Sequence, residues 1–380
     1  MTRREWLALT GMAVAGSCGR KRGTGYRGYA LIATAGDNSI AVVDLSAFQL
    51  VKTVRLNAPP AAVLPGALPN RNYVLTPSNG SVHMIDEKLN VIASQRLADG
   101  LSAIRLTADG KRLIAIAPHT RELIEADPLT LAALHRHRLS AEPIALEISP
   151  TGYAAVSTGE HGTVELVDLT SRRHFQVQLQ GPLGQIRFRA DGKLLLAANL
   201  ADCSLVALNL PALQVIAELT LAMKPENLCF NFDNGQLFVS GAGMDAVAIV
   251  FPYSPLEVDQ TILAGREPGV MACSEAPSYL FVGSNGGSDV CILNIDSRKV
   301  IGVAQIGQNP TYIAVTPDSQ YALVLDESSG DMAVIRIAAV RAKSSNTGAL
   351  PAWASISTSL FTVLEVGDRP VQAAVVPRLA

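Results

Sequence analysis

Short runs of alternating apolar residues recur along most of the chain, separated by turns rich in Asp, Asn, Gly, Ser and Pro. The clearest example lies between residues 308 and 337, where two polar turns join apolar runs at Tyr312–Val315, Tyr321–Leu325 and Met332–Ile337. Runs of this length with period-two patterning, interrupted by turn formers, predict short antiparallel strands joined by hairpins.

The turn between the first two of these strands recurs at a steady interval. The steps are 39, 42, 40, 43, 43 and 41 residues between turns at Asn70-Arg71, Asp109-Gly110, Thr151-Gly152, Asp191-Gly192, Asn234-Gly235, Pro277-Ser278 and Asp318-Ser319. Four short strands in each unit at this interval are typical of a β-propeller. We therefore expect an all-β chain that folds as a single β-propeller of four-stranded blades.

The two ends of the chain supply complementary parts of one unit. Residues 29–56 match the unit from its second strand onward, and residues 369–377 form an isolated first strand. Pairing of the C-terminal strand with the N-terminal blade would close the ring and leave no exposed sheet edge. Seven complete units and this shared one predict eight blades over residues 29–377, with an insertion at 338–360 in the last blade. Seven blades, the alternative, would need about 50 residues each, which is long for a four-stranded blade.

Residues 1–18 have the features of an export signal. Arg3 and Arg4 precede an apolar stretch that is too short to span a bilayer as a stable helix. The order Arg-Arg-Glu-Trp-Leu resembles a twin-arginine signal, and Ala-Gly-Ser-Cys resembles the lipobox of bacterial lipoproteins, with Cys18 as the lipidated residue. An ordinary signal peptide, cleaved near Ser17, is the alternative. We expect an exported bacterial protein, periplasmic or anchored to the membrane through Cys18, with residues 19–28 as a flexible tether.

The repeated units resemble the YVTN family of β-propeller repeats. The family pattern of a first strand and Pro-Asp turn, then Y-V-A-N, then V-x-V-I-D, is visible at Pro310–Asp318, Pro143–Pro150, Leu196–Asn199 and Val82–Asp86. The resemblance covers residues 29–377 and implies the propeller fold. The matching residues are turn formers and core strands, so function has to be argued from a site. The family usually has seven blades. A ring of eight blades is similar instead to the haem d1 domain of cytochrome cd1 nitrite reductases, which is also eight-bladed.

Composition excludes some partners. With 48% hydrophobic residues, 17% charged residues and a net charge of −2, the chain can bury a large core and has no basic field that would attract nucleic acid. Aromatic residues make up only 5% of the chain, so stacking side chains for single-stranded nucleic acid are few. Nucleic acid is therefore not an expected partner. Separately, we expect the protein to be a monomer.

Polar residues at the starts of first strands and between second and third strands should gather around one opening of the central channel. Lys224, Arg266 and Arg369 come from three different units and could hold an anionic ligand such as a carboxylate, phosphate or sugar acid. Glu142 and Asn309 belong to the same face. The alternative is a rim of solvated charges balanced by glutamates.

Histidines and cysteines give no complete metal motif. His119 and His161 occupy equivalent loops of adjacent units, with Glu160 beside His161, and could share a metal ion, although H-x-x-E-H and H-x-H spacings are missing there. Cys203, Cys229, Cys273 and Cys291 form no C-x-x-C and are expected to be buried free thiols. No cofactor is predicted. Because C-x-x-C-H is also missing, any haem would have to bind noncovalently.

These observations favour a non-catalytic propeller that binds a small anionic ligand or a cell-envelope protein at the channel face, since no catalytic motif accompanies the regular blades. A lactonase-type hydrolase is one alternative, suggested by lactonase propellers that resemble this repeat family; its candidate groups are Arg266, Arg369, Glu142, His119 and His161. A haem d1-type propeller, with His119 or His161 as the axial ligand, is the other.

Overall fold

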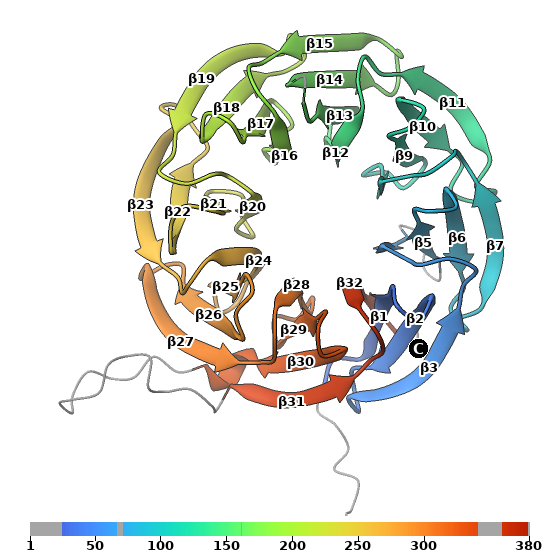
Figure 1. Cartoon of the computed structure of the whole chain (residues 1–380), viewed down its shortest axis with the longest axis vertical. Helices are drawn as coiled ribbons and strands as arrows, with labels where there is room; N and C mark the ends of the chain where they lie inside the picture. Colours follow the sequence, from blue (N-terminus) through green and yellow to red (C-terminus); the bar gives the residue numbers. More distant parts are fainter. Residues whose placement is uncertain (1–24, 67–70, 161, 341–358, 379–380) are drawn as a thin grey trace, which may run out of the picture.

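Eight four-stranded antiparallel sheets form the blades of a ring around a central opening (Figure 1). The computed structural model describes residues 25–66, 71–160, 162–340 and 359–378. The expected export signal, Cys18, His161 and most of the expected insertion at 338–360 lie outside the described residues. The prediction of an eight-bladed, all-β propeller is confirmed.

We number the blades along the chain from the N-terminus. The first four, written from the innermost strand outward, are β32 (Pro370–Pro377), β1 (Gly28–Thr34), β2 (Ser39–Asp44) and β3 (Gln49–Arg55); β4 (Ala62–Pro65), β5 (Asn72–Thr76), β6 (Ser81–Ile85) and β7 (Val91–Arg96); β8 (Ala103–Leu106), β9 (Leu113–Ala117), β10 (Glu122–Ala126) and β11 (Ala133–Arg138); and β12 (Pro143–Ile148), β13 (Tyr153–Thr158), β14 (Thr163–Asp168) and β15 (His174–Gln178).

The last four blades have the same order. They are β16 (Leu183–Phe188), β17 (Leu194–Asn199), β18 (Ser204–Asn209) and β19 (Gln214–Thr220); β20 (Asn227–Phe230), β21 (Leu237–Ser240), β22 (Ala246–Phe251) and β23 (Glu257–Leu263); β24 (Pro268–Ser274), β25 (Tyr279–Ser284), β26 (Asp289–Asn294) and β27 (Lys299–Gln305); and β28 (Pro310–Val315), β29 (Tyr321–Asp326), β30 (Asp331–Arg336) and β31 (Leu360–Glu365). A short 3-10 helix, Ile337–Ala339, follows β30. Within the described ranges, no helix is long and apolar enough to cross a membrane.

Burial changes from the inside of each blade to the outside. All residues of β5 and β6 are buried, whereas most residues of the outer strand β7 are exposed. The two middle strands are covered on both faces by neighbouring blades, which explains their nearly continuous apolar sequence. The outer strand has no strand neighbour on its outer edge, so its residues are mostly exposed and include polar side chains.

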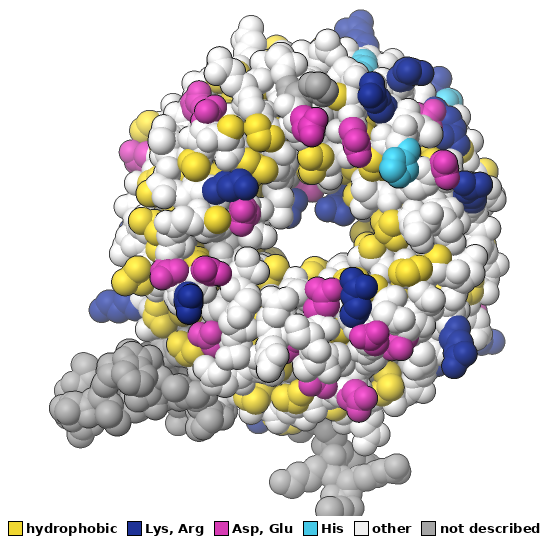
Figure 2. Space-filling view, in the orientation of Figure 1, with side chains coloured by type: hydrophobic (Ala, Val, Ile, Leu, Met, Phe, Trp, Pro, Cys, Tyr) yellow, Lys and Arg dark blue, Asp and Glu magenta, His cyan; other side chains and the backbone are white. Residues whose placement is uncertain are grey.

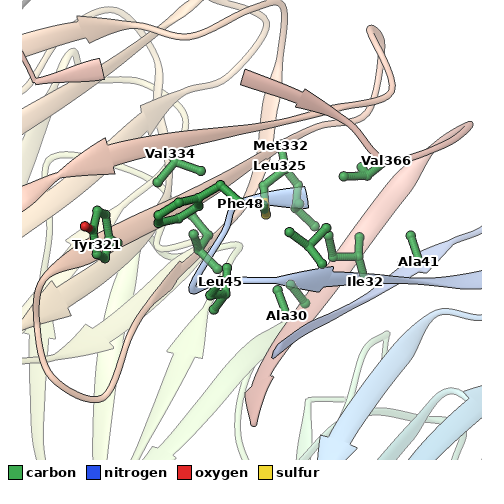
Figure 3. Packing of buried hydrophobic residues seen from close by; sticks show 13 residues of the cluster. Ala30, Ile32, Ala41, Leu45, Phe48, Tyr321, Leu325, Met332, Val334 and Val366 are labelled. Carbon is green, nitrogen blue, oxygen red and sulfur yellow. The ribbon is translucent and has the colours of Figure 1, made fainter. Parts of the chain in front are cut away.

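The ring closes inside the first blade, as the sequence predicts. β32 pairs antiparallel with β1, with Tyr29 opposite Val376. A buried apolar cluster seals the seam with the eighth blade, where Ile32 and Phe48 of the first blade meet Tyr321 and Leu325 (Figure 3). Because both chain ends contribute strands to the same sheet, the closure removes the open edges that an unclosed ring would expose.

Candidate functional site: the central channel

The innermost strand of each blade faces the central opening (Figure 1). Figure 2 shows a hollow through the centre of the ring, with Lys or Arg side chains inside it. Innermost strands have no strand neighbour on the channel side, so their half-buried side chains are the groups that a ligand in the channel would meet. This location fits the general preference of ligands for concave sites with a few polar groups.

Three charged side chains from consecutive blades form one ion-pair chain in this wall. Glu147 of β12 lies between Arg105 of β8 and Arg187 of β16. Its Oε2 atom is 3.8 Å from Arg105 Nε and 3.2 Å from Arg187 Nη1. Two guanidinium groups therefore share one carboxylate, and the group as a whole keeps an excess of one positive charge.

Burial and charge both act on Arg105. Loss of water lowers the pKa of the Arg105 guanidinium below its usual value, whereas Glu147 raises it and Arg187 lowers it further. An arginine side chain keeps its proton in proteins, so both guanidinium groups remain charged at neutral pH.

Tyr312 and Gln372 line the opposite part of the wall. Gln372 of β32 donates from Nε2 to the Tyr312 hydroxyl at 3.3 Å, and its Oε1 accepts from the backbone N–H of Val63 at 2.5 Å. Burial raises the pKa of Tyr312, although Gln372 and Arg105 lower it. Gln372 thereby links three neighbouring blades and holds the neutral Tyr312 hydroxyl in the wall.

Two thiols complete the wall. Cys229 of β20 and Cys273 of β24 place their Sγ atoms 3.7 Å apart. The sequence predicts four buried free thiols, and the described cysteines are free, but only Cys291 is fully buried. Cys229 and Cys273 are half-buried because innermost strands face the channel, and Cys203 is half-buried because it lies in a turn.

The basic residues predicted from sequence lie before β20, β24 and β32, as their repeat positions require. Lys224 Nζ is 3.6 Å from Glu226, and Arg369 Nε is 3.4 Å from Glu327. Arg266 and Glu142 are exposed. In the part of the chain that the structure describes, no hydrogen bond or ion pair joins Lys224, Arg266 and Arg369 to one another.

Asn309 has a structural role in its loop. Its backbone has a positive φ of 63°, and its side-chain oxygen accepts from the N–H of Gly286 at 3.1 Å. It therefore connects the start of the eighth blade to the seventh, and its amide oxygen is already engaged.

The predicted histidine pair lies partly outside the described residues. His119 is exposed in the loop between β9 and β10, and His161 is not described. Among the described residues, no group of three or more His, Cys, Asp or Glu side chains could hold a metal ion.

Sequence reasoning missed the charged residues of the wall, although a signal was present. Arg105, Glu147 and Arg187 each stand two residues before the turn in a mostly apolar first strand, where the eighth blade has Ala314. A charged residue at that position has to be paired or to face solvent.

No protein-family model and no curated protein matches the sequence. The fold is similar to that of the dihydro-haem d1 dehydrogenase NirN, solved in complex with DHE, with a TM-score of 0.76, 11% identity, and coverage of 92% of this chain and 75% of that chain. It is also similar to apo AztD from Citrobacter koseri (TM-score 0.66, 12% identity, 92% and 97%) and to a candidate 6-phosphogluconolactonase from Bacteroides fragilis (0.58, 15%, 83% and 97%). At such low identity these similarities show a shared propeller fold.

Proposed function

We propose that this chain is an exported, non-catalytic propeller of the YVTN repeat type, and that it binds a small carboxylate-bearing ligand in its central channel. The observation that supports this function is the excess of guanidinium over carboxylate in the wall, where Arg105 and Arg187 share Glu147. Paired guanidinium groups are suited to bidentate recognition of carboxylates.

Both arginines have donors to spare. Arg105 Nη1 donates to the carbonyl of Ile104 at 3.0 Å, and Arg187 Nη1 contacts Glu147. Among the described residues, the Nη2 groups of both arginines have no hydrogen-bond partner. The hydroxyl of Tyr312 is a further polar group for an acidic ligand, and it already has one partner in Gln372.

The rim residues are weaker candidates than the wall. Lys224 and Arg369 are paired, and their side chains are 44% and 61% exposed, so water screens their charge. Arg105 and Arg187 are less exposed, at 40% and 30%, and belong to strands rather than loops. A charge held on a rigid strand and partly shielded from solvent attracts an anion more strongly than a mobile rim charge does.

Isothermal titration calorimetry with a series of mono-, di- and tricarboxylates, and with inorganic phosphate, tests this function. We expect saturable binding of at least one polycarboxylate, weakened by about tenfold or more in Arg105→Gln and in Arg187→Gln, since a lost charge-assisted pair costs about 1.5–3 kcal/mol. Lys224→Gln is the matched control and should bind normally. Equal binding by all three variants, or no binding by the wild type, would overturn the assignment.

A carboxylated tetrapyrrole is a second candidate ligand, because NirN has been solved in complex with DHE and the arginines suit acidic side chains. No described innermost strand has a histidine, so the axial ligand would have to come from a loop, with His119 as the described candidate. A shifted Soret band on haem addition that is lost in His119→Ala would favour this ligand. An unshifted band would remove it.

Lactone hydrolysis has less support from the wall. Glu147 is the one carboxylate in the ion-pair chain of the wall, and the Oε2 atom of Glu147 already contacts both arginines. In the described part of the chain, Oε1 remains free to accept a proton, but a general base also needs a water or substrate positioned for attack, and the ion-pair chain offers no second carboxylate for that role. Hydrolysis of a sugar lactone that is abolished in Glu147→Gln would reverse this choice.

Export and anchoring rest on the N-terminal sequence alone. The twin-arginine pattern and Cys18 predict a cell-envelope location with the propeller on a short tether. Fractionation of cells that produce the full chain, with Cys18→Ser as the comparison, tests this part. We expect the wild type in the membrane fraction and Cys18→Ser in the soluble periplasmic fraction.

A further inference from the structure

We propose that Cys229 and Cys273 are a redox-active dithiol that closes reversibly into a disulfide across the seam between the sixth and seventh blades. The two Sγ atoms are 3.7 Å apart, within reach of a hydrogen bond. A disulfide needs a separation of about 2.05 Å, so closure requires the sulfurs to approach by less than about 2 Å. Side-chain rotation and a small movement between neighbouring blades can supply this.

The position of the pair makes the reaction accessible. Cys229 lies in β20 and Cys273 in β24, which are adjacent innermost strands packed against each other. Both side chains are half-buried and, together with Met271, pack against a buried apolar cluster that includes Phe238 and Leu280. The apolar side holds the thiols together, and the channel side admits a small reagent.

The surroundings distinguish the two thiols chemically. The hydrogen bond with Cys273 and the nearby charge of Arg187 lower the pKa of Cys229 against the effect of burial, whereas the hydrogen bond with Cys229 and burial both raise the pKa of Cys273. The thiolate is the nucleophile in thiol–disulfide exchange. Cys229 is therefore the attacking residue, and Cys273 is the residue that resolves the mixed disulfide.

A low-molecular-weight disulfide, such as glutathione disulfide, is the oxidant. The Cys229 thiolate attacks one of its sulfurs, which forms a mixed disulfide and releases one thiolate. Cys273 then loses its proton to the released thiolate and attacks the Cys229 sulfur, which forms the intramolecular disulfide and releases a second thiolate. Two protein thiols are oxidised, one external disulfide is reduced to two thiols, and the proton of Cys229 goes to the second of them.

The other two described cysteines differ in ways that make them controls. Burial raises the pKa of Cys291 to about 12, so it stays protonated at neutral pH. Cys203 is half-buried in the turn before β18, and no described thiol contacts it. Neither has a thiol partner comparable to the pair in the wall.

Peptide mapping after equilibration with glutathione redox buffers tests the proposal. Cleavage after glutamates separates the thiols, because Glu218 and Glu226 lie between Cys203 and Cys229, and Glu275 lies between Cys273 and Cys291. We expect oxidising buffer to join the segment 227–257 to the segment that ends at Glu275, with a mass loss of about 2 Da, and dithiothreitol to reverse it. The Cys203→Ser variant should form the same link.

Alkylation rates and melting temperatures give a second, independent measurement. The rate at which iodoacetamide alkylates Cys229 should fall several-fold in Arg187→Gln, while the rate at Cys203 stays unchanged. Oxidised protein should also melt at a higher temperature than reduced protein, and this difference should vanish in Cys273→Ser. The proposal is wrong if Cys229 and Cys273 take up glutathione independently without joining, or if Cys229 reacts no faster than Cys203 and does not respond to Arg187→Gln.

Discussion

Glu147 Oε2 lies 3.2 Å from Arg187 Nη1, so one carboxylate joins the innermost strands of the fourth and fifth blades. The same oxygen also faces Arg105 of the third blade. This carboxylate has two effects that act in opposite directions. It stabilises the wall by compensating two arginines, and it repels the carboxylate of any ligand that those arginines would bind.

The variant Glu147→Gln separates these effects. Removing the charge should lower the stability of the protein by about 1–2 kcal/mol, less than for a fully buried pair because all three side chains are partly exposed. It should also tighten carboxylate binding by about tenfold, since the ligand no longer meets a like charge. Urea unfolding and calorimetric titration measure the two quantities on the same sample.

Glu142→Gln is the matched control for this prediction, because Glu142 lies on the same blade but is exposed at the rim. It should change neither stability nor binding beyond error. A Glu147→Gln protein that binds carboxylates more weakly than the wild type would contradict the prediction, because it would mean that Glu147 positions the arginines rather than competing with the ligand.

The seam between the first and eighth blades gives a prediction about closure. The Tyr321 ring is 1% exposed and packs edge to face on Phe48, with ring centroids 4.9 Å apart, and Phe361 packs beside them at 5.8 Å from Tyr321. Tyr321→Ala should cost about 3–5 kcal/mol, because it leaves a cavity where the two chain ends meet. Phe232→Ala, at a ring that is 65% exposed, should cost less than about 0.5 kcal/mol. If Tyr321→Ala lowered the free energy of unfolding by no more than Phe232→Ala does, the packing of Tyr321 at the seam would not contribute to stability.

The fold could be predicted from sequence because it is repeated. Turn formers such as Asp109-Gly110 and Asp191-Gly192 recur where a hairpin needs positive φ, and Gly110 and Gly192 have φ values of 66° and 65°. The missing first strand of the first unit and the spare strand at residues 369–377 then predicted the closure that β32 and β1 make.

The channel wall could be predicted only in part, because it depends on contacts between units. Nothing in the sequence around Cys229 indicates that its sulfur meets that of Cys273, which is 44 residues away. Their contact follows from the rotation between adjacent blades. The pairing of Lys224 with Glu226 and of Arg369 with Glu327 likewise depends on loop geometry, which repeat position alone does not determine.

Buried glutamates on middle strands make stability depend on acidity. Burial would raise the pKa of Glu165, but hydrogen bonds from His174 and Ser140 overcome it and hold the pKa below the usual value of 4.5. His174 Nε2 lies 2.6 Å from Glu165 Oε2. Glu125 has the same arrangement, since His137 and Arg112 offset the effect of burial and its pKa is also lowered.

A lowered pKa in the folded state means that the unfolded chain binds protons more readily. The stabilisation from Glu165 is therefore complete above about pH 4.5 and is lost as the pH falls through the lower pKa of the folded protein. Glu165→Gln removes this contribution, so the free energy of unfolding should fall less steeply below pH 4.5, by at most about 1.4 kcal/mol per pH unit. Urea unfolding between pH 3 and pH 7 measures the slope, with the exposed Glu160→Gln as the control. An acid slope in Glu165→Gln as steep as that of the wild type would show that His174 and Ser140 do not hold this carboxylate in its charged form.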